Sequence, residues 1–156
     1  MFATGFEVTQ MAARLGVVGS GGRHLVDAWA DDNPSAYLGI SVPGFPNFFC
    51  LQGPNSGLGH GGSAIFQSEC QSRHITSCLV EMAARGASRI EVTQHAHDVD
   101  VAEVDAAHEQ MIWTHPGMST YYRNRHGRVV TVTPWRLVDY WSRTHELDPS
   151  AYRFGG

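Results

Sequence analysis

One stretch of the chain has the periodicity of an amphipathic helix. Between Ser63 and Arg85, apolar residues recur at i, i+3, i+4, i+7 and i+8, which is the spacing of one helical face. These residues are Ile75, Cys78, Leu79, Met82 and Ala83. Towards the start of the stretch the same face becomes small or polar, at Ala64, Ser68 and Gln71. The pattern predicts a helix over 63–85 followed by Gly86 at the left-handed C′ position.

Shorter patterns predict the other elements. The continuous apolar run at 48–51, bounded by turns, favours a buried strand over 47–52. Further strands are expected over 36–40, 89–93 and 128–132, and further helices over 10–15, 24–30, 98–112 and 135–143. The glycine-rich stretch 16–22 is interpreted as a hairpin or loop, and 148–156 as a tail. Phe2 and Ala3 fit either the end of a strand or a disordered terminus.

Composition places the chain among globular proteins of about one domain. It has 156 residues, of which 42% are hydrophobic, and a formal net charge of −4. That charge gives no basic surface for nucleic acid, so no nucleic-acid partner is expected. The three cysteines form no close-spaced ligand or disulfide pattern, and no apolar run is long enough to span a bilayer. With no targeting segment, we expect a cytoplasmic protein without membrane contact.

The glycine-rich loop over 53–62 is the strongest candidate for chemistry. It lies between an expected strand and the expected helix, an arrangement that points backbone N–H groups and a positive helix end at one place. Two common loop motifs do not fit, because no Lys-Ser/Thr pair follows and Ser56 lacks the G-x-S-x-G spacing. Ligand binding and a purely structural turn both stay open on these grounds.

Several motifs, in order, resemble one enzyme family. The segment YLGISVPGFPNFF at 37–49, followed by Gly53-Pro54-Asn55, is similar to the C-terminal half of type I Baeyer–Villiger monooxygenases, especially the branch acting on hydroxyacetophenone-like ketones. The residues ATGF at 3–6 resemble the motif that closes the nicotinamide-binding domain of that family. The residues MSTYY at 118–122 resemble its Ser-Trp-Tyr region, and Trp135, Tyr140-Trp141 and 148–152 continue the match.

The resemblance implies a fold, two cofactors and a site. It implies an α/β chain: the C-terminal portion of an FAD-binding Rossmann-like domain plus a mostly helical extension, incomplete relative to the family. The expected segments are 1–35, a remnant of the link from the NADPH-binding domain; 36–93, the strand-loop-helix part of the FAD domain; and 94–156, the helical extension. FAD and NADPH would be the cofactors, with the flavin carrying the redox chemistry. Residues beside the flavin ring would be Gly53, Pro54, Asn55, Ser56, Leu58, Gly59, His60 and Gly61, and those at the substrate pocket Met118, Ser119, Thr120 and Tyr121.

The sequence also departs from the family. It contains neither of the two G-x-G-x-x-G motifs that would bind the pyrophosphates of FAD and NADPH. No arginine matches the motif of the family's catalytic arginine, so no catalytic residue is assigned. We expect a fragment of a monooxygenase that inserts oxygen into ketones, paired with an N-terminal FAD- and NADPH-binding polypeptide or self-associating through an exposed apolar face. The alternative is a non-catalytic binding module, or a subunit of a split flavoprotein.

Other candidate residues are assigned ordinary roles. The run His95-Ala96-His97-Asp98 resembles a metal-binding pattern, but a turn with Asp98 as N-cap is favoured and no metal is expected. His60 either contacts flavin or is satisfied by backbone, and His74 is interpreted as an ordinary helix residue. Core positions are expected for Cys70 and Cys78, and core or interface positions, rather than substrate platforms, for Trp113, Trp135 and Trp141. A surface turn is expected for Arg123, Arg125, His126 and Arg128, with contact to a cofactor phosphate as the alternative.

Overall fold

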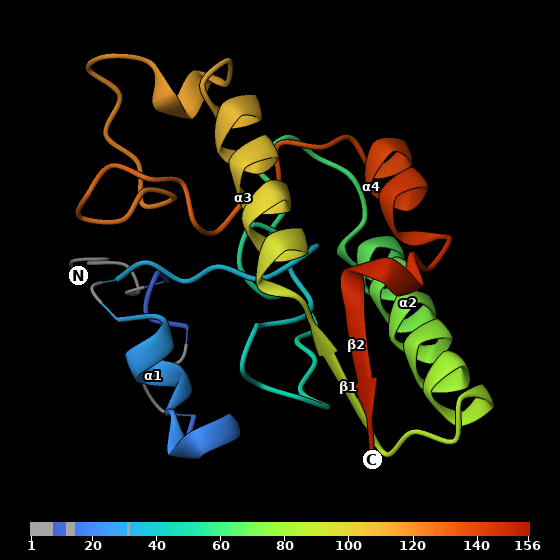
Figure 1. Ribbon diagram of the computed structural model, residues 1–156. Coiled ribbons are helices and arrows are strands. Elements are labelled where there is room, and N and C mark those ends of the chain that lie inside the picture. The colour runs from blue at the N-terminus through green and yellow to red at the C-terminus, as the bar shows by residue number, and fades with distance from the viewer. Residues whose placement is uncertain (1–7, 12–14, 31) are drawn as a thin grey trace.

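The computed structural model describes residues 8–11, 15–30 and 32–156. Two long helices, α2 (Ala64–Ala84) and α3 (Gln94–His108), lie on either side of a small sheet, and α4 (Leu137–Thr144) packs near the start of α2 (Figure 1). The short elements are α1 (Leu25–Ala28) and the 3-10 turns η1 (Ser20–Gly22), η2 (Ile112–Thr114) and η3 (Pro149–Ala151). Helices with one small sheet agree with the α/β pattern at this coarse level.

The sheet joins the middle of the chain to its last residues. Strand β1 (Arg89–Val92) confirms the strand predicted over 89–93, and it pairs antiparallel with β2 (Tyr152–Gly155). The prediction of a tail over 148–156 was therefore wrong. Tyr152 is buried and Arg153 exposed, so the segment has the alternation of a strand that packs one face.

Helix α2 has the predicted ends but not the predicted buried face. The Ser63 hydroxyl accepts a hydrogen bond from the Phe66 amide, and Gly86 has φ +63 with the paired bonds of a Schellman motif. The expected apolar face was only partly right, because Cys78 and Met82 lie in the core whereas Leu79 is 45% exposed and Ala83 is exposed as well. The residues that α2 buries are Gln67, Cys70, Gln71, His74 and Cys78. Cys70 and Cys78 thus lie in the core as predicted.

The buried face of α2 is held by polar contacts. His74 is 1% exposed, and its two ring nitrogens lie 3.1 Å from the Thr144 carbonyl oxygen and 2.9 Å from the Tyr152 hydroxyl. Burial lowers the pKa of His74, so the ring is neutral at pH 7. His74 therefore ties α2 to both α4 and β2, and the interpretation of it as an ordinary helix residue was wrong.

The strands predicted before the loop are absent. Residues 36–40 form a turn in which Leu38 has φ +54, and within 47–52 both Asn47 and Gln52 have positive φ, at +58 and +54. Left-handed residues cannot continue an extended strand, so the apolar run folds back on itself instead. Residues 128–132 form isolated bridges rather than the expected strand.

The remaining helices shift by a few residues. Helix α3 begins at Gln94 rather than at 98, with Thr93 as its N-cap, so Asp98 lies inside the helix and not at its cap. Helix α1 is shorter than the predicted 24–30, α4 begins two residues later than predicted, and 16–22 is a loop closed by a bridge between Val18 and His24. Part of the helix predicted over 10–15, and the motif at 3–6 with Phe2 and Ala3, lie outside the described residues.

Three apolar clusters form the core of the described chain. One gathers around Leu25 and Phe45, one around Cys78 and Ile90 between α2 and the sheet, and one around Trp113 and Val132 beneath the glycine-rich loop. The third cluster positions the candidate site. No helix among the described residues is long and apolar enough to cross a membrane.

Candidate functional site

The first half of the glycine-rich loop is fixed to the protein through its backbone. The Asn55 amide donates to the Val130 carbonyl at 2.9 Å, and the Gly57 amide donates to the Thr131 carbonyl at 2.8 Å. In return the Thr133 amide donates to the Gly57 carbonyl at 2.8 Å. These bonds form a short parallel bridge between 55–57 and 130–133, and they leave the Asn55 and Gly57 amides no capacity for a ligand.

The side chains of this half also turn inward. Asn55 has φ +55, and its Nδ2 donates to the carbonyl oxygens of Val129 at 2.8 Å and Val132 at 3.3 Å. Ser56 is fully buried, and its hydroxyl donates to the Gly53 carbonyl. Gly53 and Pro54 are buried too. Residues 53–57 therefore form the base of the loop.

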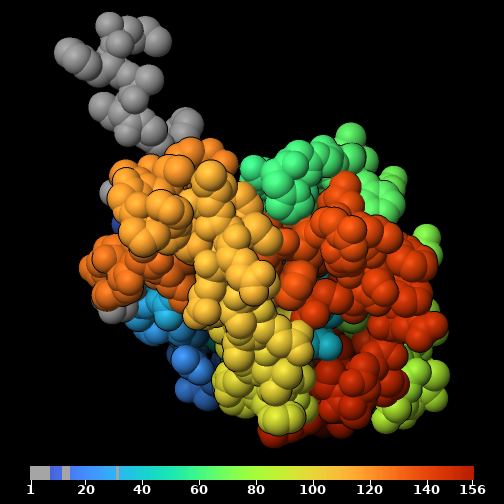
Figure 2. Space-filling view, turned by 90° about the horizontal axis from the view of Figure 1, so that it is seen from above, coloured from blue at the N-terminus to red at the C-terminus, as the bar shows by residue number. Residues whose placement is uncertain are grey.

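The second half of the loop is open. The amides from Leu58 to Ala64 donate to no acceptor among the described residues, and His60 and Gly61 are exposed. Gly61 and Gly62 have φ +92 and +118, which strongly favour glycine. In Figure 2 this green segment lies on the surface between the orange residues around 110–125 and the red residues of α4. The free amides lead directly into the positive end of α2, a 21-residue helix.

A tryptophan supports the open half from below. A Cβ on Gly59 would come within 3.1 Å of the Trp113 ring, so glycine is needed for this close approach. His60 stacks on the same indole, with ring centroids 6.4 Å apart and planes 17° apart. The prediction that Trp113 is a core anchor is confirmed, since the residue is 6% exposed.

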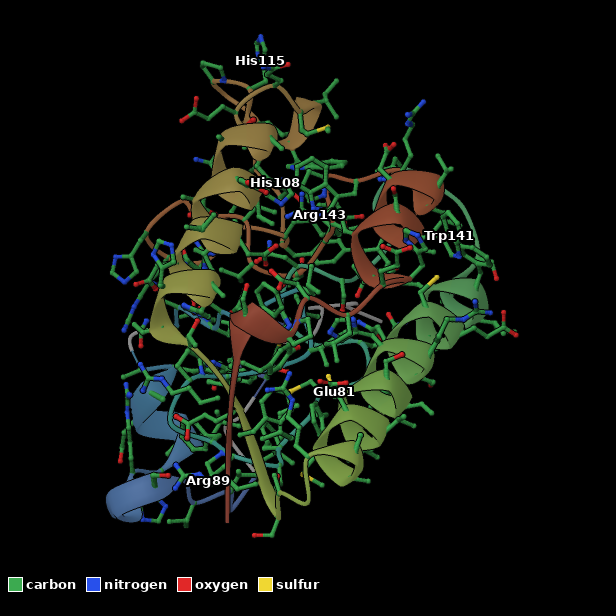
Figure 3. The ribbon with its side chains drawn as sticks, turned by 45° about the vertical axis from the view of Figure 1, so that its right-hand side comes forward. Glu81, Arg89, His108, His115, Trp141 and Arg143 are labelled. Atoms are coloured by element: carbon green, nitrogen blue, oxygen red, sulfur yellow. The ribbon has the colours of Figure 1, made fainter. Side chains whose placement is uncertain are left out.

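His108 holds the tryptophan in place. The Trp113 indole N–H donates to His108 Nδ1 at 2.9 Å, so Nδ1 carries no proton and Nε2–H donates to the Val132 carbonyl at 3.1 Å. Burial lowers the pKa of His108 to about 4, so the ring is neutral at pH 7. Figure 3 shows His108 on α3, on the side that faces the core. No sequence pattern had singled out this residue for the site.

The predicted substrate segment reaches the same tryptophan. Tyr122 meets the Trp113 ring edge-on at 5.9 Å, and Tyr121 packs against Tyr122 at 4.5 Å. Met118 is 41% exposed and Tyr121 is 65% exposed, with Ser119 exposed and Thr120 half-buried between them. The structure therefore brings the end of 118–122 and the loop residues 59–60 together through Trp113.

A second polar centre, which no sequence pattern indicated, lies between α3 and α4. Asp100 accepts bonds from the Leu38 amide and from Arg143, at 2.8 and 2.7 Å, and Arg143 also pairs with Glu103 at 2.8 Å. The Tyr140 hydroxyl donates to the Leu38 carbonyl at 2.7 Å. Figure 3 shows Arg143 between the two helices. A cavity of about 390 Å³ opens beside it. Since these groups bond one another, we interpret the cluster as the joint that holds α4 against α3.

The two histidines of the run 95–98 lie in different surroundings. His97 is buried, with its ring nitrogens 3.0 Å from the Ser35 hydroxyl and 2.8 Å from an Asp98 carboxylate oxygen, whereas His95 is exposed. Within the described ranges, no three histidine, cysteine or acidic side chains are placed to hold a metal ion.

Known proteins resemble the chain in both sequence and fold. An uncharacterized monooxygenase of Sinorhizobium fredii is 45% identical over 97% of this chain, and a Baeyer–Villiger monooxygenase of Pseudomonas aeruginosa is 32% identical over 97%. The crystal structure of OTEMO in complex with FAD and NADP superposes with a TM-score of 0.80 at 25% identity, covering 98% of this chain. Over nearly its whole length, the chain is therefore similar to one part of the Baeyer–Villiger-type flavin monooxygenases. No family model matches the sequence.

The Baeyer–Villiger relatives are much longer than this chain. It spans 23% of the Sinorhizobium protein, 29% of the Pseudomonas protein and 29% of the OTEMO chain. An oxidized steroid monooxygenase bound to NADP gives a similar result, with a TM-score of 0.74 at 28% identity over 88% of this chain and 26% of that one. The family resemblance drawn from residues 37–49 and 53–55 is confirmed.

Proposed function

We propose that this chain forms one wall of the flavin site in an FAD- and NADPH-dependent monooxygenase that inserts one oxygen atom into ketones. One observation carries the proposal: the row of amides from Leu58 to Ala64, unbonded within the described chain, at the positive end of α2. The similarity to Baeyer–Villiger monooxygenases and to a structure named as a complex with FAD and NADP supports a flavin as the ligand.

The residues present fit a flavin ring. Gly61 has open space where a Cβ would stand, so a flat ligand could approach its backbone closely. Unbonded amides at a helix N-terminus favour negative charge, and a reduced flavin carries negative charge on its pyrimidine edge. Leu58, Gly59, His60 and Gly61 would hold the ring. Gly53, Pro54, Asn55 and Ser56 would hold those residues in place, since their own polar groups bond inward.

The chemistry divides between cofactor and chain. When bound, FAD supplies the redox chemistry, with NADPH as its reductant. The chain supplies donors from the loop and an apolar lining from the exposed side chains of Met118 and Tyr121 beside Ser119 and Thr120. We propose residues 36–93 as the C-terminal part of a Rossmann-like FAD domain and 94–156 as its helical extension. The remaining walls would come from an N-terminal FAD- and NADPH-binding polypeptide.

Flavin binding by the loop is tested by NMR titration of the 15N-labelled chain. FAD and riboflavin are added separately, because riboflavin has the ring without the pyrophosphate. We expect both to shift the amides of Leu58 to Ala64, since the loop contacts the ring. Shifts confined to other residues, or none at millimolar ligand, would contradict the proposal. Inosine monophosphate serves as the control for unspecific stacking on exposed aromatic side chains.

Ketone oxidation needs a complete enzyme and is tested in a hybrid protein. This chain replaces the matching 29% of the Pseudomonas Baeyer–Villiger monooxygenase, to which it is 32% identical. The hybrid should retain FAD and convert a ketone to an ester with consumption of NADPH, measured by gas chromatography. The parent enzyme with that segment deleted is the control. A hybrid that holds FAD and oxidises NADPH but forms no ester would limit the chain to a non-catalytic role.

A further inference from the structure

Trp113 lies where the glycine-rich loop, helix α3 and the segment 118–122 meet. It follows α3 directly, in η2, and its side chain is 6% exposed. On one side the indole lies against Gly59 and stacks with His60. On another it meets the edge of Tyr122, with centroids 5.9 Å apart and planes 83° apart. The proposed flavin-facing and substrate-facing residues therefore contact one ring.

The position of that ring is determined by hydrogen bonds as well as by packing. The indole N–H donates to His108 Nδ1, and His108 Nε2–H donates to the Val132 carbonyl. Val132 also packs on the loop side, since its Cγ1 would lie 3.3 Å from a Cβ on Gly59. The indole is thus held in one orientation and cannot tilt without leaving the buried His108 acceptor unpaired, which is unfavourable.

We propose that Trp113 is a positioning residue that sets the spacing between the flavin-facing loop 58–62 and the segment 118–122. Because the ring is rigid and contacts both, a displacement of the loop moves Tyr122, and a displacement of Tyr122 moves the loop. The chemistry of the two sides rests on the proposed function. The mechanical coupling is a property of this chain alone, and it determines the room left for a ketone between the loop and Tyr121.

The first experiment displaces the ring from the loop side. In Gly59→Ala the new Cβ meets the indole, whereas in Gly61→Ala, the matched control in the same loop, it meets open space. The 1H and 15N chemical shifts of the labelled chain are measured at every amide. We expect Gly59→Ala to shift the amide signals of Tyr121 and Tyr122 as well as those of the loop, and Gly61→Ala to shift the loop signals alone. Equal effects of the two variants at Tyr122 would overturn the proposal.

The second experiment removes the hydrogen bond between Trp113 and His108. Trp113→Phe keeps an aromatic ring but deletes the N–H that bonds His108, and Trp141→Phe is the control because Trp141 is 39% exposed on α4. In Trp113→Phe, the amide signals of both Gly59–His60 and Tyr121–Tyr122 should shift, and a further Gly59→Ala change should no longer affect the signal of Tyr122. If Trp113→Phe unfolds the chain, the single Gly59→Ala and Gly61→Ala variants still decide the question.

A riboflavin titration distinguishes the proposed coupling through Trp113 from the proposed flavin binding. Riboflavin added to the wild-type chain should shift the loop amides and also those of Tyr121 and Tyr122, and in Trp113→Phe the second set should stay in place. Loop shifts without any response at Tyr122 would contradict the coupling and leave flavin binding supported. A loop that does not respond to riboflavin, together with a positive Gly59→Ala result, would contradict flavin binding and leave the coupling supported.

Discussion

The two halves of the glycine-rich loop differ in what their backbone amides do. In residues 53–57 the amides of Asn55, Ser56 and Gly57 all bond carbonyls of the protein. In residues 58–62 they bond nothing within the described chain, and the support comes from the ring of Trp113. A loop can therefore be glycine-rich for two reasons at once. The first half stabilises the fold, and we propose that the second half presents donors to a ligand. Substitutions in the first half should therefore lower stability, and those in the second half should lower ligand affinity.

The largest effect is expected at Asn55. Asn55→Ala removes the donors to the Val129 and Val132 carbonyls and places alanine at φ +55. Each lost buried bond and the left-handed backbone cost about 1–2 kcal/mol, so we expect about 3 kcal/mol and a fall in Tm of about 8 °C. Asn55→Gly restores the backbone freedom and should recover about 1 kcal/mol of this. Thermal melts by circular dichroism measure both, and equal losses would contradict the backbone contribution.

Acid should destabilise the fold at His108, which lies beneath both halves of the glycine-rich loop. The folded pKa of His108 is about 4, below its ordinary 6.5, so the unfolded chain takes up a proton first as pH falls. Stability is fully present above about pH 6.5 and should fall by about 2.5 kcal/mol by pH 4.5, from this group alone. His74, whose pKa is also lowered, adds to the loss in the same direction. Urea unfolding at several pH values measures it, and His108→Gln should flatten the dependence.

A smaller effect is expected where the first half approaches residues 130–133. In Gly57→Ala the new Cβ would lie 2.9 Å from the Thr131 carbonyl oxygen, which is backbone and yields little. We expect a loss of about 1–2 kcal/mol in urea unfolding, from strain in the bridge to Val132. The matched substitution in the second half is Gly61→Ala, whose cost of about 1 kcal/mol comes from φ +92 alone. Gly16→Ala serves as a control remote from the loop. A Gly61→Ala loss larger than that of Gly57→Ala would reverse the assignment of the halves.

The smallest effect on stability is expected at His60. The side chain is exposed and stacks on Trp113, so His60→Ala should change the free energy of unfolding by less than about 0.5 kcal/mol. Its effect should instead fall on riboflavin affinity, because the ring would be missing from the proposed ligand face. Isothermal titration compares it with Asn55→Gly, which should reduce stability more than affinity. Loss of stability without loss of affinity in His60→Ala would place this residue with the first half.

Local signals in the sequence were sufficient for the two ends of α2 and for the glycine-rich loop. Ser63 and Gly86 are cap residues whose chemistry acts over a few positions, and the structure uses them as predicted. The loop was recognised because its glycines are local as well. The strand expected over 47–52 failed because Asn47 and Gln52 adopt left-handed backbones that tertiary contacts require, with Asn47 bonding Ile90 and Gln52 bonding Gln71.

The buried face of α2 and the residues that support the loop depended on contacts between residues distant in sequence. The buried face of α2 was predicted from apolar periodicity, yet His74 is buried because Tyr152, 78 positions away, supplies a partner. His108 and Trp113 could not be joined to the loop from sequence, because nothing local shows that Val132 and Gly59 pack on the same ring. The same long-range contacts determine which loop residues can face a ligand. The spacing of residues could therefore indicate the loop, but not that its first half bonds inward and its second half is open.

The pairing of β1 with β2 sets the order in which the molecule can assemble. Val92 pairs with Tyr152, so all of α3, Trp113, the segment 118–122 and α4 lie within one long chain loop that this pairing closes. Closing so long a loop carries a large entropic cost and slows folding, because the contacts that reward it are non-local. We therefore expect α2 and α3 to form before the sheet, and the packing of His74 on Tyr152 to complete only with it. The proposed ligand site would then be among the last parts of the protein to reach its final form.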